Sequence, residues 1–439
     1  MSLYIDKLIS VEAALSRVKS GDTIVVGLAA AEPRVFLGAL HTIADRVIDV
    51  TVTTCLPMLE AAYFADPSYK PSFTMAGWFY TGAMRQAHKH GNITFIPNHL
   101  HLAARKRLAF VRPNIYIGNA SLPDKHGYVS LGVSNVYEKR MLEAADVVML
   151  EINPHVPRTH GDLEVHIRDV DYMIETNYRL PEIPDAPPSD KDLKIGHLIA
   201  EHILDGDCIQ LGIGGIPNAV AASLEGKRDL GVHTEMFTSG MMQLIKQGVI
   251  TNGAKTLHRG KAVCCFVLGT QELYEFVDDN PSIWVLDGGY VNDPAVIGVN
   301  DNQVSINTTL EVDLTGQCCS ESIGPLQYSG TGGQTDTAVG AQRAKNGRSF
   351  IALYSTALVT NPVTKTKEEI SKIVPMLKPG AIVSLSRNDV DFVVTEYGVA
   401  ALRGTSVRER AGRLIAIAHP QFRSQLWQEA VAYGFLPEE

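Results

Sequence analysis

The sequence lacks the cysteine spacings that indicate a metal site or a disulfide framework. Its 439 residues include six cysteines, four of them in two adjacent pairs, and none belongs to a CxxC motif. We therefore expect buried, reduced thiols and no bound metal. No run approaches the roughly 20 consecutive apolar residues that span a bilayer, and no charged and apolar leader opens the chain. These absences predict a soluble cytoplasmic protein without a membrane partner.

The sequence also lacks an excess of positive charge. Acidic residues outnumber basic residues, the formal net charge is −9 and the isoelectric point is about 5.9. Because phosphate contacts depend on lysine and arginine, we expect no nucleic-acid partner. A phosphate-bearing ligand would need a local group of basic residues.

The stretch from residue 205 to residue 240 combines a glycine-rich turn with a carboxylate. Residues 208–211 (CIQL) predict a buried strand, and GIGG follows as a turn almost without side chains. Pro217 suits the first turn of a helix that stops at Gly226. A second strand over residues 231–237 would bring Glu235 to the carboxyl end of a parallel sheet, where open α/β sheets bind ligands.

Two chemical interpretations of this unit remain open on the residues alone. In the first, the turn is a dinucleotide fingerprint and Glu235 binds a ribose hydroxyl, although Pro217 stands where GxGxxG requires its third glycine. In the second, backbone N–H groups of the turn polarise a carbonyl group that Glu235 attacks as a covalent nucleophile. The candidate donors are Gly212, Ile213, Gly214, Gly215 and Ile216. The structural alternatives are a surface glutamate at a strand end and, for His233, a half-buried histidine, which is favoured over a base.

The unit occurs twice in the chain. Gly21 and Gly27 precede Gly206 and Gly212 by 185 residues, and residues 49–55 align with residues 229–235 at a separation of 180. This repetition predicts two copies of one α/β unit. In the first copy the turn reads GLAA and Cys55 stands in the place of Glu235, so that copy keeps the scaffold without the site. A reactive thiol at Cys55 is disfavoured because its neighbours supply no base.

Further strands and a linker complete the predicted organisation. Strands are predicted at residues 114–119, 127–132 and 145–150, with counterparts at 312–316, 328–333 and 391–395. Four prolines within residues 181–190 predict an extended linker. The predicted domains are therefore residues 1–180 and 191–439, two tandem, similar, open α/β domains.

Several blocks of the sequence resemble one enzyme family. GIGGIPNAV followed by HTEMFTSG resembles the acetyl-CoA hydrolase/transferase branch of the class I coenzyme A (CoA) transferases, most closely the 4-hydroxybutyrate and butyryl-CoA:acetate CoA-transferases. The blocks SINTTLEVDLTGQCCSES, YSGTGGQTD and DFVVTEYGVAALRGTSVRERA extend the resemblance over nearly the whole chain. The resemblance implies α/β domains of the NagB/RpiA-like type and a homodimer or higher homo-oligomer.

The resemblance also implies an activity and a set of site residues. It identifies Glu235 as the residue that forms a glutamyl-CoA thioester during CoA transfer between carboxylates such as acetate, butyrate or 4-hydroxybutyrate. CoA and acyl-CoA would be substrates, with no tightly bound cofactor. Gly330 and Gly333 would contact the thiol end of CoA, and the backbone of Leu310 would add a further contact.

The sequence leaves open the function, the role of one basic segment and the role of one long connection. The alternative functions are an acyl-CoA hydrolase and a non-catalytic nucleotide- or sugar-phosphate-binding regulator. The basic segment 252–261 would reach the CoA phosphates in one interpretation, but a solvated turn is favoured. The connection 358–372 is longer than the resemblance predicts, so Lys365 and Lys367 are only candidates for a CoA contact.

Overall fold

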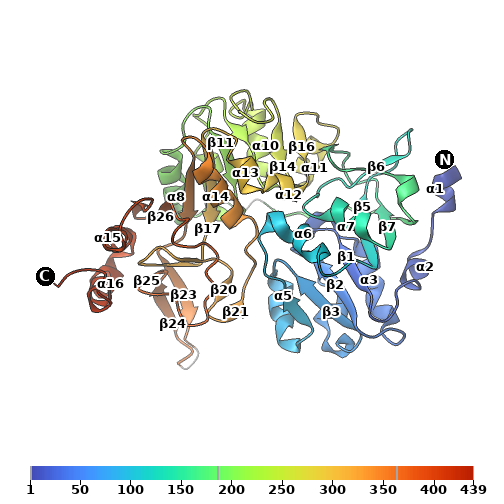
Figure 1. Cartoon of the computed structure of the whole chain (residues 1–439), viewed down its shortest axis with the longest axis horizontal. Helices are drawn as coiled ribbons and strands as arrows, with labels where there is room; N and C mark the ends of the chain where they lie inside the picture. Colours follow the sequence, from blue (N-terminus) through green and yellow to red (C-terminus); the bar gives the residue numbers. More distant parts are fainter. Residues whose placement is uncertain (1, 185–186, 362–363, 439) are drawn as a thin grey trace.

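A parallel sheet forms the centre of the N-terminal half in the computed structural model, which describes residues 2–184, 187–361 and 364–438 (Figure 1). Its strands are β1 (Thr23–Val26), β2 (Val50–Thr54), β3 (Phe73–Gly77), β4 (Ile93–Phe95), β5 (Ile115–Ala120), β7 (Val147–Ile152) and β10 (Tyr172–Glu175). They lie in the order β10-β7-β5-β1-β2-β3-β4, and all pair in parallel.

The C-terminal half repeats this arrangement. Its main strands are β11 (Cys208–Leu211), β12 (Gly231–Val232), β17 (Gln303–Thr308), β22 (Arg348–Ala352), β26 (Phe392–Thr395) and β27 (Gly398–Ala401). Their order is β12-β11-β17-β22-β26-β27, with only the last pair antiparallel. β11 lies between β12 and β17 as β1 lies between β2 and β5, which confirms two tandem, similar α/β units.

Backbone geometry supports the repeat at individual positions. Gly21 and Gly206 have φ values of 80° and 81°, and Asp49 and Asp229 have φ values of 58° and 54°. The strand matching, however, needs correction, because the sheet order makes β17 the counterpart of β5 and β22 the counterpart of β7. Residues 328–333 form a turn instead of a strand. The predicted pairs of equivalent strands were wrong because the second copy has additional short strands after β17. These strands change the residue spacing between the two copies.

The predicted strand over residues 231–237 is interrupted. After β12, a single bridge joins His233 to Val263, and the chain resumes as β13 (Met236–Phe237), which pairs with β15 (Phe266–Val267). Glu235 therefore lies at a break between two short strands. Its backbone can bend there and present the carboxylate to the space between the two halves.

The remaining elements are further short strands and the α-helices. The other strands are β6 (Tyr128–Ser130), β8 (His160–Gly161), β9 (Glu164–His166), β14 (Ala262–Cys264), β16 (Ile283–Val285), β18 (Glu311–Asp313), β19 (Cys318–Cys319), β20 (Ser322–Ile323), β21 (Leu326–Gln327), β23 (Thr356–Thr360), β24 (Lys367–Ser371) and β25 (Ile373–Val374). The α-helices are α1 (Ser2–Asp6), α2 (Val11–Leu15), α3 (Arg34–Ala39), α4 (Ala62–Ala65), α5 (Gly82–Ala87), α6 (Ala103–Leu108), α7 (Glu138–Ala144), α8 (Asp190–Ala200), α9 (Gly215–Ala222), α10 (Ser239–Lys246), α11 (Gln271–Val277), α12 (Gly288–Val291), α13 (Pro294–Ile297), α14 (Gln334–Arg343), α15 (Val407–Ile417) and α16 (Pro420–Ala432). No helix among the described residues has the length and apolar character needed to cross a membrane.

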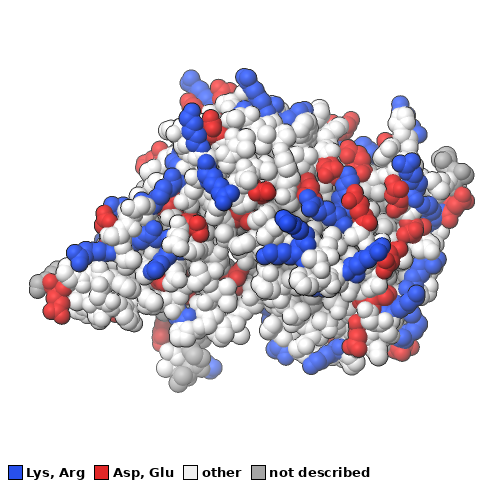
Figure 2. Space-filling view, in the orientation of Figure 1, with Lys and Arg blue, Asp and Glu red and all other residues white. Residues whose placement is uncertain are grey.

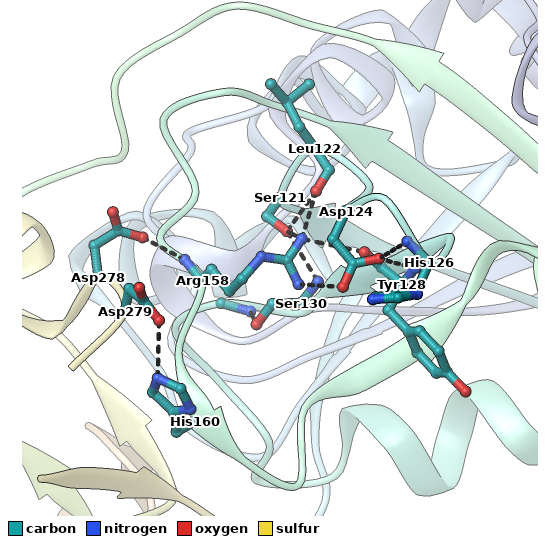
Figure 3. Close-up of polar contacts among 11 residues, drawn as sticks. Ser121, Leu122, Asp124, His126, Tyr128, Ser130, Arg158, His160, Asp278 and Asp279 are labelled. Atoms are coloured by element: carbon teal, nitrogen blue, oxygen red, sulfur yellow. Dashed lines mark hydrogen bonds and ion pairs between the residues drawn. The ribbon is translucent and has the colours of Figure 1, made fainter. Parts of the chain in front are cut away.

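The two halves are joined by more than the linker. The largest hydrophobic cluster draws buried residues from both sheets, and β8 of the first half pairs with β16 of the second. Next to β8, the backbone N–H of Arg158 donates to Asp278 over 2.7 Å while its guanidinium donates to the carbonyl oxygens of Leu122 and Tyr128 (Figure 3). The halves therefore share a packed interface.

The linker is only partly described. Tyr274 donates to the carbonyl oxygen of Pro181 over 2.7 Å, which holds the start of the linker against α11. Residues 185 and 186, inside the predicted linker, lie outside the described residues. The domain boundaries at residues 180 and 191 stay a prediction.

The cysteines are buried, as their spacing predicted. All six are free of disulfide bonds. In the described part of the chain, no group of three or more His, Cys, Asp or Glu side chains is arranged to hold a metal ion. Among the described residues on the face shown in Figure 2, basic and acidic side chains are interspersed, so this face presents no continuous basic surface.

Candidate active site

A pocket of about 210 Å³ opens between the two halves of the chain. The N-terminal half contributes a mainly apolar wall that includes Leu28, Trp78 and Tyr137. The C-terminal half contributes more polar residues, among them Gln210 and Asn307. Glu235 is the only Asp, Glu, Lys, Arg or His residue among those that line the pocket, all of which are described. Any charge-based chemistry in the pocket therefore depends on Glu235.

Glu235 is fixed by both its backbone and its side chain. Its carbonyl oxygen accepts hydrogen bonds from the backbone N–H groups of Cys265 and Phe266, at 3.0 and 3.1 Å. Its Oε2 atom accepts a hydrogen bond from Nδ2 of Asn292 over 2.9 Å. A reactive group held in this way loses little freedom when a substrate binds, which favours reaction.

Asn292, which the sequence motifs did not predict, is itself positioned by buried groups. The thiol sulfur of Cys265 lies 3.7 Å from the Oδ1 atom of Asn292 and 3.2 Å from the carbonyl oxygen of Glu235, so it contacts both residues. His233 donates from Nε2 to the carbonyl oxygen of Val291 over 2.8 Å, next to Asn292 in the chain. Burial lowers the pKa of His233 to about 3, so the ring stays neutral. His233 is thus a structural residue, as the sequence favoured, but it supports the segment that carries Asn292.

The environment of Glu235 disfavours its charged form. Burial is the main cause, and the negative charge of Asp336 adds to it, so the pKa of Glu235 rises to about 7. Hydrogen bonds from Asn292 and from the backbone of Gly333 oppose this rise because they stabilise the carboxylate. Asp336 is anchored by His101, whose backbone N–H and ring Nδ1 bond its carboxylate at 3.0 and 2.7 Å. A carboxyl group with a pKa near neutrality in a pocket is a candidate for catalysis.

The second glycine cluster approaches Glu235 more closely than any side chain would allow. A Cβ atom added to Gly333 would lie 1.8 Å from Oε2 of Glu235, and one added to Gly330 would lie 2.3 Å from the carbonyl oxygen of Trp78. Gly332 has a φ of +53° and its carbonyl oxygen accepts a hydrogen bond from Leu100. Because the turn has no side chains at these positions, its backbone fits between the carboxylate of Glu235 and the N-terminal half. Gly330 and Gly333 both line the pocket together with Glu235.

The first glycine loop reaches the pocket with part of its length. Gly212 and Ile213 line the pocket, whereas Gly214, Gly215 and Ile216 are not among its lining residues. Gly214 has a φ of +113° and directly precedes α9. The N–H of Gly212 donates to the carbonyl oxygen of Ile306 over 3.2 Å, so it is not available to a ligand. The N–H groups of Ile213 and Gly214 have no hydrogen-bond partner among the described residues.

Several other candidates lie elsewhere or are occupied. Leu310 is not among the lining residues, and its N–H donates to the carbonyl oxygen of Cys319. In the basic segment 252–261, Nζ of Lys255 is buried and donates to two carbonyl oxygens, so this lysine is not solvated in the way that the favoured interpretation expected, and it does not reach a CoA phosphate either. Lys365 and Lys367 belong to the exposed hairpin β23–β24, and residues 362 and 363 within the long connection lie outside the described residues.

Cys55 lines the same pocket as Glu235. Burial and the nearby charges of Glu235 and Glu138 raise the pKa of the Cys55 thiol well above its usual range. Since the thiolate is the reactive form, this environment keeps Cys55 unreactive, in agreement with the sequence interpretation.

Known proteins resemble this chain over nearly its whole length. The profile of the acetyl-CoA hydrolase/transferase N-terminal domain matches residues 1–183, and that of the C-terminal domain matches residues 269–430. The chain is 42% identical to the succinyl-CoA:cyclohexane-1-carboxylate CoA transferase of Geobacter metallireducens, covering 97% of this chain and 95% of the relative. It is also 42% identical to the 4-hydroxybutyrate coenzyme A transferase of Clostridium kluyveri, covering 97% and 98%. The crystal structure of 4-hydroxybutyrate CoA-transferase from Porphyromonas gingivalis superposes with a TM-score of 0.79 at 38% identity, covering 98% and 99% of the two chains.

Proposed function

The chain belongs to the acetyl-CoA hydrolase/transferase family and is a CoA-transferase, and from this premise we propose that Glu235 carries CoA between two carboxylates as a glutamyl thioester. The observation that carries the proposal is that Glu235 is the single charged side chain in the pocket between the halves. Relatives named for 4-hydroxybutyrate and butyrate support acyl groups of this kind for this chain, with acetate as a partner acid.

The proposed reaction begins with attack by a carboxylate oxygen of Glu235 on the thioester carbonyl carbon of an acyl-CoA. The carbon–sulfur bond breaks, CoA leaves as a thiolate, and an acyl-glutamyl anhydride remains. The thiolate then attacks the Glu235 carboxyl carbon, which releases the first acid as a carboxylate and leaves a glutamyl-CoA thioester. A second carboxylate reverses these steps and departs as the new acyl-CoA.

The groups around Glu235 suit this sequence. Asn292 and the backbone N–H of Gly333 point at the carboxylate and would hold the oxyanion that forms when CoA attacks it. The N–H groups of Ile213 and Gly214 are free to bind the acyl or pantetheine oxygen. The remaining candidates, Gly215, Ile216 and Leu310, lie outside the pocket lining, so any contact that they make with CoA lies beyond the pocket. We further propose a homodimer or higher homo-oligomer that acts in the cytoplasm.

The raised pKa of Glu235 predicts how the rate depends on pH. The carboxylate is the nucleophile, so kcat/KM falls as pH decreases through about 7, where Glu235 becomes protonated. Asn292→Ala removes a hydrogen bond to the charged form and moves the inflection to higher pH, whereas Asp336→Asn removes a negative charge and moves it to lower pH. Rate profiles from pH 5 to pH 9 measure both shifts. Coincident profiles for the three proteins would contradict the assignment.

Initial-velocity kinetics test the proposed function. Because one glutamate carries CoA between two acids, the first product leaves before the second acid binds. Double-reciprocal plots with a butyryl-CoA donor and varied acetate should therefore be parallel. Intersecting lines would indicate direct transfer in a ternary complex, and thiol release independent of acetate would indicate a hydrolase.

A further inference from the structure

The turn that carries Gly333 is held at both ends by the N-terminal half of the chain. At its start, the backbone N–H of Tyr80 donates to the carbonyl oxygen of Ser329 over 3.2 Å. At its end, His101 bonds the carboxylate of Asp336 through two donors, its backbone N–H at 3.0 Å and its ring Nδ1 at 2.7 Å. An ionised carboxylate only accepts hydrogen bonds, so Nδ1 carries a proton. The first half therefore fixes the position of this turn.

Asp336 occupies a helix position from which a carboxylate ordinarily bonds backward along the chain. Gly333 is the N-cap residue of α14, and Asp336 is the third residue of that helix. In a capping box, the side chain at this third position accepts a hydrogen bond from the backbone N–H of the N-cap residue. The start of α8 forms this box, in which the N–H of Ser189 donates to Asp192 over 2.8 Å, and α15 begins with a second one. The same bond between Gly333 and Asp336 would therefore be normal for this chain.

At α14, where both residues are described, this bond is absent. The carboxylate oxygens of Asp336 bond His101, and the backbone N–H of Gly333 bonds the carboxylate of Glu235 instead. Gly333 has a φ of −97° and a ψ of 12°, outside the extended region that is usual for an N-cap residue. As a glycine, it can change this conformation easily. Two carboxylates, those of Glu235 and Asp336, can thus compete for one N–H group.

We propose that His101 is a positioning residue for CoA transfer, which reserves the N–H of Gly333 for Glu235 by occupying the competing carboxylate of Asp336. The inference rests on the proposed function of Glu235 and adds a residue from the other half of the chain. His101 is not among the residues that line the pocket, so it acts through Asp336 and Gly333 and not on the substrate.

The size of the effect follows from what Glu235 loses without His101. Asp336 is buried, and a buried charge without a partner is costly, so its carboxylate takes the donor that the N-cap position of its own helix offers. Glu235 then keeps the amide of Asn292 but loses the N–H of Gly333. Loss of one oxyanion donor costs roughly a hundredfold to a thousandfold in kcat. Because this donor acts on the oxyanion, we expect kcat to fall while KM for the acyl-CoA changes little.

Leucine and asparagine at position 101 separate the donor from the size of the side chain. The two residues are similar in shape, but the amide nitrogen of asparagine can donate where Nδ1 of the histidine does. At pH 9, above the pKa of about 7 of Glu235, His101→Leu should lose about a hundredfold in kcat and His101→Asn only about threefold. His99→Leu is the matched control, because the His99 ring stacks on that of His101 outside the pocket lining, and kcat should stay unchanged. Equal kcat values for His101→Leu and His101→Asn overturn the proposal.

A substitution of Asp336 distinguishes competition from simple support of the interface. Asp336→Ala removes the competing carboxylate, so the double variant His101→Leu/Asp336→Ala should have a kcat about tenfold higher than that of His101→Leu. If His101 only supports the interface, the double variant is no more active than His101→Leu, and the proposal is overturned. If His101→Leu does not fold, Asp336→Ala alone decides. It should keep at least about a tenth of the wild-type kcat, and a larger loss overturns the proposal.

Failure of this inference is distinguishable from failure of the proposed function. If Glu235 does not carry CoA, the wild-type protein forms no covalent CoA intermediate with any donor. If only the role of His101 is wrong, the wild type forms the intermediate, and folded His101→Leu forms it at the same rate.

Discussion

Glu235→Ala should lower CoA transfer by at least about three orders of magnitude, because a covalent enzyme without its nucleophile keeps only binding and oxyanion stabilisation. Glu235→Gln should lose as much activity while it preserves the size of the side chain and an oxygen that can accept from Asn292. The measurement is acyl-CoA formation from acetyl-CoA and butyrate. Retention of more than about a tenth of the wild-type rate in either variant would rule out a glutamyl thioester as the main route.

Thermal unfolding shows whether the Gln variant is folded and gives an independent test of the site. The pKa of Glu235 is raised in the folded state, so the wild-type protein loses stability as pH rises from the unfolded-state value through about 7. Gln does not ionise, so at pH 8 Glu235→Gln should unfold at a higher temperature than the wild type. At pH 4 the difference should largely disappear. A lower unfolding temperature at pH 8 would mean that the carboxylate stabilises the fold, contrary to its environment.

Gly333→Ala should reduce transfer by about a hundredfold, because the new Cβ must displace the carboxylate that it would otherwise overlap. The added atom would lie 1.8 Å from Oε2 of Glu235 and 2.2 Å from Nδ2 of Asn292, so both reactive partners have to move. kcat/KM for CoA transfer measures the effect.

Gly412→Ala is the matched control for this substitution. Gly412 lies in α15 and an added Cβ would meet no atom within 4 Å. Activity should stay at the wild-type level there, and stability should be equal or slightly higher, because alanine favours helices over glycine. Equal activities of the two glycine variants would show that the close approach at Gly333 has no catalytic importance.

The sequence was sufficient for those parts of the fold and site that are encoded locally. The strand, glycine turn and helix that lead from Cys208 to Ala222 follow one another in the chain, so propensity and turn chemistry predict them directly. Glu235 was found because it belongs to a motif and to a repeat. The interruption of its strand was not predicted, since it depends on pairing with Val263 and Phe266, distant in the sequence.

The partners of Glu235 could not be read from local patterns. Asn292 is separated from it by 57 residues and belongs to no motif, and only the folded chain brings the amide to the carboxylate. The need for glycine at position 333 also comes from the tertiary structure. A side chain there would overlap Glu235, not the backbone of the turn that contains Gly333. The bond between His101 and Asp336 joins segments that are far apart in the chain, so its importance appears only when the two halves are packed together.

The most direct test of Glu235 as the carrier of CoA is to map the covalent intermediate by mass spectrometry. The protein is incubated with butyryl-CoA without an acceptor acid, digested at low pH and searched for a peptide that has gained CoA with loss of water. We expect this adduct on the peptide containing Glu235, its discharge by acetate, and its absence in Glu235→Gln. An active protein that forms no such adduct, or one that carries CoA only as a reductant-sensitive disulfide at Cys55, would contradict the role of Glu235 as the carrier.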